Sequence, residues 1–225
     1  MLSVPYKSLR LLRSLTLWMT ALTIAGVGSQ QSPDQGSPQS TSAMPVYFPP
    51  GQTDASIFSV ILASLSEPSL LEAAKNANVL SFRLSYFLPV PMREIAVRLV
   101  VNADGSGQIT TAVSSGAAAG VKRTQNSVSG ADVNKMLQLL EKVEFWSMSS
   151  TENTEQKTDA AGRKVYVLDG SCWMVEGVHE GSFHYVYRRN PKPSPITEIG
   201  CYLAKDLAKP DDSVISLPGC PSHGR

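Results

Sequence analysis

The sequence predicts an α+β domain in which an antiparallel sheet of hairpins and a meander packs against two main helices. Short turn sequences join runs of β-forming residues at Asp104-Gly105, Asp169-Gly170 and Glu180-Gly181, which favours neighbouring antiparallel strands. Two longer stretches repeat apolar residues with the helical period, one after Ser129 and one after Ser194. These helices lie between and after the strands and do not alternate with each of them, as is typical of the α+β class.

Composition and charge indicate one globular domain of ordinary size. The chain has 225 residues, and its 20 Lys and Arg against 19 Asp and Glu leave a formal net charge of +1. The basic residues are scattered and not interleaved with aromatic residues, so the sequence disfavours nucleic-acid binding. We expect a single domain from 53 to 209 and an irregular C-terminal tail from 210 to 225.

The N-terminal residues have the pattern of a secretory signal peptide. Basic residues precede an uncharged apolar run from Ser14 to Val27, and the small residues Gly28 and Ser29 follow it. The run is shorter than the roughly 20 residues that cross a bilayer, so we expect a cleaved signal peptide at 1–29 and a periplasmic or secreted protein. The alternative is an N-terminal membrane anchor, which is the only membrane contact expected.

A linker and a short helix are predicted next. Residues 30–52 are rich in Gln, Ser, Pro and Gly, a composition that predicts a disordered linker. Asp54 is a suitable N-cap for the helix that follows. The apolar stripe expected for that helix is Ile57, Val60, Ile61 and Leu65. Glu67-Pro68 then begins a further short helical segment.

The middle of the chain contains a hairpin and a long helix. Alternation predicts a strand over 82–88 and a hairpin with strands at 95–101 and 109–113. Residues 114–120 are small and are expected to form a surface loop. Ser129 and Asp132 resemble a capping box at the start of the long helix. Its apolar stripe is Val133, Met136, Leu137, Leu140 and Val143.

The region from Lys164 to Arg189 is predicted to be a three-stranded meander, preceded by a polar connector. Two-residue turns would place Trp173 opposite both Tyr166 and Arg188. The face expected in the core carries Val165, Val167, Cys172, Met174, Glu176, Val178, Phe183, Tyr185 and Tyr187. The opposite face, expected to be available for recognition, carries Lys164, Tyr166, Leu168, Trp173, Val175, His184, Val186 and Arg188. A last helix begins at Ser194-Pro195, with the apolar stripe Ile196, Ile199, Gly200, Leu203 and Leu207.

The residues capable of catalysis do not form a known catalytic pattern. His179 and His184 are five positions apart and flank a turn, whereas a zinc protease helix needs a spacing of four, so neither a metal nor a cofactor is expected. Cys172 and His184 fall on opposite faces, which disfavours a thiol nucleophile with its base. Glu176 would be costly to bury without a partner. We expect it at a sheet edge, where backbone donors or an Arg satisfy it, and the alternative is an acid with a raised pKa.

Four residues of the meander form the candidate binding site: Tyr166, Trp173, His184 and Arg188. Aromatic and Arg side chains are enriched at binding hot spots, and Arg188 opposite Trp173 permits a cation–π contact. Internal support of the sheet is the alternative role. Among three cysteines, Cys201 and Cys220 are the candidate disulfide, and Cys172 with Cys201 is its rival.

Several short motifs together resemble one known family. They are Glu67-Pro68-Ser69-Leu70, Asp104-Gly105-Ser106-Gly107, Phe145-Trp146, and Leu168-Asp169-Gly170 with Trp173, Glu176-Gly177, His184, Arg188 and Pro191. The set is similar to an uncharacterised family of predicted exported bacterial proteins of the acidobacterial type. The chain departs from it at His179 and at Arg189-Asn190. The resemblance implies a domain that extends from about Glu67 to Leu207, and it implies no activity.

The sequence therefore predicts a non-catalytic exported domain that binds a partner protein or an envelope component. One alternative is a hydrolase that uses Glu176 and His184. Another is a purely structural envelope protein.

Overall fold

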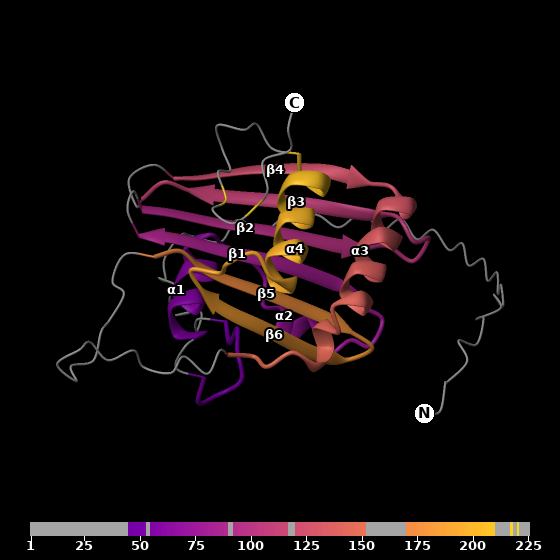
Figure 1. Cartoon of the computed structure of the whole chain (residues 1–225), viewed down its shortest axis with the longest axis horizontal. Coiled ribbons are helices and arrows are strands. Elements are labelled where there is room, and N and C mark those ends of the chain that lie inside the picture. Colours follow the sequence, from indigo (N-terminus) through magenta and orange to yellow (C-terminus); the bar gives the residue numbers. More distant parts are fainter. Residues whose placement is uncertain are drawn as a thin grey trace, which may run out of the picture. The chain divides into compact units, whose positions relative to one another are not determined.

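A computed structural model contains one antiparallel sheet of six strands in the order β4-β3-β2-β1-β5-β6 (Figure 1). The strands are β1 (Ser81–Pro89), β2 (Met92–Val101), β3 (Gly107–Ser114), β4 (Val121–Val128), β5 (Cys172–His179) and β6 (Ser182–Arg189). The predicted α+β class with an antiparallel sheet is confirmed.

The structure describes residues 45–52, 55–89, 92–116, 120–151, 170–209, 217 and 220, all within the compact unit 42–225. The predicted signal peptide, Asp54 and the first strand of the predicted meander, including Tyr166, lie outside these residues. Within the described part of the chain, no helix is both long and apolar enough to cross a membrane.

Helices cover both faces of the sheet. Face A, which carries Trp173, is covered by α3 (Gly130–Lys142) and by α4 (Pro195–Cys201), which continues as the π-helix η3 (Tyr202–Leu207). These helices lie in front of the strands in Figure 1. Face B is covered by α1 (Ser56–Ser64), by α2 (Leu70–Ala73), and by Tyr47 and Phe48. Tyr47 and Phe48 fall within the predicted linker, so the packed domain begins before residue 53.

The core on face A is centred on Trp173, whose side chain is 0 % exposed. Its ring contacts Tyr86 edge to face, with 5.8 Å between the ring centroids, and lies below Gly200 of α4. The predicted apolar stripes of both long helices also enter this core. Their buried members are Val133, Met136 and Leu140 in α3, and Ile196, Ile199, Gly200, Leu203 and Leu207 in α4 and η3. The expectation that this face is open for recognition is therefore wrong.

The hairpin of β5 and β6 has the predicted register. Trp173 pairs with Arg188, and Gly177 pairs with His184. Glu180 and Gly181 both have positive φ, at 49° and 77°, as a type I′ turn requires. On its other side β5 pairs with β1, and Tyr86 is the residue opposite Trp173. The prediction that Tyr166 occupies this position is wrong.

Three local features of the structure differ from the sequence-based expectations. β4 was not predicted, because seven of its eight residues are exposed and show no apolar alternation. In α1, Ile57 and Val60 are 41 % and 61 % exposed, and Phe58 and Leu62 are buried in their place. The buried stripe of this helix is therefore rotated from the predicted one. The short helix expected to begin at Glu67-Pro68 begins later, as α2, with Ser69 as its N-cap, whose hydroxyl accepts from the Glu72 N–H.

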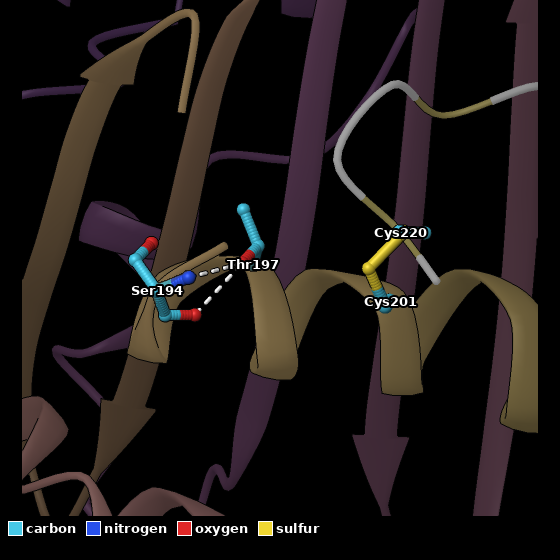
Figure 2. Close-up of a disulfide and its surroundings, with 4 residues drawn as sticks. All are labelled: Ser194, Thr197, Cys201 and Cys220. Atoms are coloured by element: carbon cyan, nitrogen blue, oxygen red, sulfur yellow. Dashed lines mark hydrogen bonds between the residues drawn. A yellow bond between two sulfur atoms is a disulfide. The ribbon is translucent and has the colours of Figure 1, made fainter. Parts of the chain in front are cut away.

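Cys201 and Cys220, the predicted pair, form a disulfide that joins the C-terminal tail to the end of α4 (Figure 2). At the other end of α4, the Ser194 N–H donates to Oγ1 of Thr197 at 2.8 Å. That hydroxyl in turn donates to the Ser194 carbonyl at 2.7 Å. Leu217 of the tail is buried in the core on face A. Cys172 remains a buried free thiol.

Replacing Gly200 by Ala is expected to lower the free energy of unfolding by about 1–3 kcal/mol, the usual cost of overpacking a core. A Cβ at this position would lie 2.5 Å from Cζ3 of Trp173. Denaturant unfolding of G200A, W173F and the double variant would measure the coupling between the two sites. Because Phe lacks the clashing ring atoms, the G200A penalty should shrink in the W173F background; strict additivity would contradict this contact.

Replacing Cys201 and Cys220 together by Ala should lower the free energy of unfolding by about 3 kcal/mol, the value for closing a loop of comparable length. The two residues are 19 positions apart. Thermal unfolding of this variant beside C172A, which keeps the disulfide, gives the comparison. Peptide mapping of the non-reduced protein should recover Cys172 as the thiol. Recovery of Cys220 as a free thiol would contradict the pairing.

Candidate functional site

The structure does not assemble the predicted binding site. Trp173 is fully buried, and its Nε1 has no hydrogen-bond partner among the residues that the structure describes. The Arg188 guanidinium donates to the Ser149 carbonyl from both Nη atoms, at 3.1 Å each, and to the Tyr187 carbonyl at 2.7 Å. Arg188 therefore helps to attach residues 149–151 to β6, and Trp173 cannot contact a partner through the packed helix.

His184 lies on face A in an aromatic cluster beside the hairpin turn. Its ring packs edge to face against Phe145, 5.1 Å away, and at 6.2 Å from Trp146. Burial lowers the pKa of His184, and hydrogen bonds to the Met148 and Phe145 carbonyls oppose that shift. Nε2 of His184 is buried, and within the described part of the chain it has no hydrogen-bond partner. A neutral imidazole in this environment supports the packing of the segment around Phe145.

Glu176 and His184 are on opposite faces of the sheet. The residue opposite His184 in the ladder is Gly177, so Glu176 points to the other side. The two groups cannot act on one substrate. Cys172 also lies on face B, where its Sγ is 3.6 Å from the Tyr187 hydroxyl.

Face B instead carries a row of six polar residues, one from each strand, which we call the polar row. In order across the sheet they are Gln125, Thr110, Arg98, Arg83, Glu176 and Tyr185. Neighbours in this row face each other directly in the strand register. The middle of the row is buried, and its β4 end is open to solvent.

The centre of the polar row is a bidentate ion pair between Arg83 and Glu176. Nε and Nη2 of Arg83 donate to the two carboxylate oxygens of Glu176, both at 2.7 Å, and both side chains are 0 % exposed. Nη1 of Arg83 donates to the Pro68 carbonyl at 2.7 Å. Burial raises the pKa of Glu176, whereas the Arg83 guanidinium opposes that shift. Arg83 thus satisfies Glu176 as predicted, although in an interior strand.

The Glu67 carboxylate offsets the repulsion between two neighbouring arginines, Arg83 and Arg98. Arg83 and Arg98 face each other across β1 and β2, an arrangement that is unfavourable by itself. The buried Glu67 carboxylate lies at this point, where Oε2 accepts from Nε of Arg98 at 2.9 Å and is 3.8 Å from Nη1 of Arg83. Oε1 accepts from Nη1 of Arg123 at 2.8 Å.

The backbone around Glu67 is fixed from both sides. The Glu67 N–H donates to the Leu62 carbonyl at 2.8 Å, and the Tyr47 hydroxyl donates to the Glu67 carbonyl at 2.9 Å. Ser66, just before it, has a φ of 49° and turns the chain between α1 and α2. These contacts fix the backbone from which the Glu67 carboxylate projects, and they do not involve the outer arginines.

Glu67 holds two partly exposed arginines at one place on the surface. The side chain of Arg98 is 19 % exposed and that of Arg123 is 37 % exposed. Nη2 of Arg123 also donates to the Leu65 carbonyl. Among the described residues, Nη1 and Nη2 of Arg98 have no hydrogen-bond partner. We call this region, formed by Arg98, Thr110, Arg123 and Gln125, the arginine surface.

The network carries an excess of positive charge at the arginine surface. Three guanidinium groups and two carboxylates leave one positive charge when both carboxylates are ionised. Guanidinium groups bind carboxylate, sulfate and phosphate oxygens through paired hydrogen bonds. In the described part of the chain, no group of three His, Cys, Asp or Glu is placed to bind a metal. The arrangement is therefore suited to anion binding.

Comparisons with family models, curated proteins and solved structures found no match for this chain.

Sequence reasoning missed the arginine surface because its parts are far apart along the chain. Glu67 contacts Arg98 and Arg123 at separations of 31 and 56 residues. The signal present in the sequence was Glu176, a charged residue at a core-facing position, whereas Arg83 alternates with Phe82 and Leu84 and gave no such signal. Only the pairing of β1 with β5 brings those two together.

Replacing Arg83 by Met should lower the free energy of unfolding by about 3–5 kcal/mol at neutral pH, because Glu176 is left buried without its cation. The pKa of Glu176 should then rise further. The folded state would bind this proton more tightly than the unfolded state, so the stability of R83M should increase as pH falls through the raised pKa.

The double variant R83M/E176L removes both charges and should recover much of the loss, with little added pH dependence. Urea unfolding of both variants across the acidic range measures this. Equal stabilities for R83M and R83M/E176L at neutral pH would contradict the role of the pair.

Proposed function

We propose that this chain is a non-catalytic, exported binding domain that recognises anionic groups on a partner protein or envelope component through the arginine surface. The observation that carries the proposal is the geometry of Glu67. One buried carboxylate orients two partly exposed guanidinium groups toward the same patch. The predicted signal peptide and the disulfide between Cys201 and Cys220 support export.

Orientation by Glu67 favours binding because it reduces the cost of ordering two long side chains. A free surface Arg loses rotamer entropy when it binds an anion. Arg98 and Arg123 have already lost much of that freedom through their hydrogen bonds to Glu67. The positive charge of the network is available to an incoming anion, since Glu67 balances only part of it.

A catalytic role has no comparable support. Glu176 is saturated by Arg83, and His184 lies on the opposite face among aromatic rings. The hydrolase alternative requires these two groups to meet. A purely structural role would leave the arginine surface without affinity for anions, so the binding experiment also tests that alternative.

The test is titration with an oligomer of acrylate at low ionic strength. Arg98→Gln and Arg123→Gln should each weaken binding roughly 10–100-fold, the effect of losing one hydrogen bond to a charged group. Lys142→Gln is the matched control, because it removes one positive charge from a side chain that is 71 % exposed on α3. Thermal unfolding checks that each variant is folded.

Equal weakening by all three substitutions would indicate a general effect of net charge and would contradict the proposal. So would the absence of acrylate binding by the wild-type protein at low salt.

A further inference from the structure

β4 is an edge strand, and no described strand pairs with its outer side. It is the last strand of the sheet and pairs with β3 over its whole length. Among the described residues, its backbone makes no hydrogen bond to any segment except β3. Seven of its eight residues are exposed. An edge of this length presents a row of backbone donors and acceptors to an incoming strand.

The opposite edge strand, β6, is partly covered by another segment of the chain. The Tyr187 N–H on β6 donates to the Ser150 carbonyl at 2.7 Å, and Arg188 donates to the Ser149 carbonyl. Residues 149–151 therefore lie against β6 and use part of its hydrogen-bonding capacity. In the described chain β4 has no equivalent segment along its outer side.

The side chains of β4 include basic and polar groups and no acidic group. Lys122 projects on face A and Arg123 on face B, so basic groups flank the edge on both sides. Thr124, Gln125, Asn126 and Ser127 supply polar groups along the rest of the strand. Asn126 also donates from Nδ2 to the Ala208 carbonyl at 3.1 Å.

We infer that β4 binds an extended acidic peptide, which adds to the sheet as a seventh strand. The inference rests on the proposed function, because Arg123 belongs to both the arginine surface and β4. It deepens that function by naming the ligand as a polypeptide recognised through its backbone. Backbone hydrogen bonds to β4 supply affinity, and carboxylates beside Lys122 and Arg123 supply selectivity.

A second copy of this chain fits the edge less well than an acidic peptide. Pairing two β4 strands would bring two basic edges together and would bury few apolar side chains. Lysine on an edge strand also disfavours pairing between identical sheets. An acidic strand instead places opposite charges beside each other across the new ladder.

The experiment compares a glutamate peptide with an acrylate oligomer that has the same number of carboxylates. Both can reach the arginine surface, but only the peptide has backbone amides. We expect the peptide to bind about tenfold more tightly or better, as several added hydrogen bonds imply. Hydrogen exchange of β4 amides should slow with the peptide, at alternate residues, and should not slow with acrylate.

Two proline variants test the edge itself. Backbone N–H groups alternate in direction along a strand, and Thr124 and Ser127 are three positions apart outside the arginine surface. One of Thr124→Pro and Ser127→Pro therefore removes an N–H that points outward, and the other removes one that bonds to β3. The variant that keeps the wild-type melting temperature should lose the preference for peptide over acrylate and should retain acrylate binding. The exchange experiment on the wild-type protein does not depend on either variant folding.

The outcomes separate the two proposals. Failure of both ligands to bind overturns the proposed function and this inference together. Equal binding of both ligands, with no slowed exchange in β4, overturns the inference and leaves the proposed function intact. Protection of β4 amides in the ligand-free protein, together with a dimer in light scattering, overturns it in favour of a second copy.

Discussion

The structure depends on the neutralisation of two arginines that face each other within a sheet. Arg83 and Arg98 are direct neighbours on β1 and β2, and Arg83 is fully buried. Taking such charges out of water costs several kcal/mol for each ion unless partners are well placed. Glu176 supplies one partner from β5, and Glu67 supplies another from the turn between α1 and α2. The position of α1 on face B and the order of the strands are thus electrostatically linked.

The same network connects the interior to the surface. Its buried end holds β5 against β1, and its exposed end positions Arg98 and Arg123. A buried ion network is rarely more stabilising than apolar residues of the same volume. Its value lies in the orientation of groups that remain partly accessible, which is the property a binding surface requires.

Local sequence patterns predicted the helices and strands better than they predicted which strands and helices lie side by side. The positive φ values at Glu180 and Gly181 follow from turn chemistry that the sequence displays, so the register of β5 and β6 was predictable. The apolar stripes of α3 and α4 were predictable because apolar residues recur there with the helical period. The pairing of Trp173 with Tyr86 was not, because a contact between residues so distant in sequence leaves no local pattern. β4 was missed because a strand exposed on both faces has no hydrophobic alternation. The candidate site depends on contacts that no local pattern shows. Trp173 is buried because α4 packs over it, and Arg98 belongs to the arginine surface because Glu67 orients it.

The strand order β4-β3-β2-β1-β5-β6 has a consequence for how the chain folds. β1 to β4 pair with sequence neighbours, as do β5 and β6, and each of these ladders closes a short loop. The seam between β1 and β5 is different, because Arg83 and Glu176 are 93 residues apart. Its contacts require the largest loss of chain entropy in the sheet. Loop-closure entropy therefore favours a folding order in which the two halves form locally and then meet at this seam. The ion pair at its centre requires that they join in the correct register. A shift of one residue would place Glu176 on face A, away from Arg83, leaving a charge in an apolar core. The buried pair thus acts as a check on the alignment of the two halves.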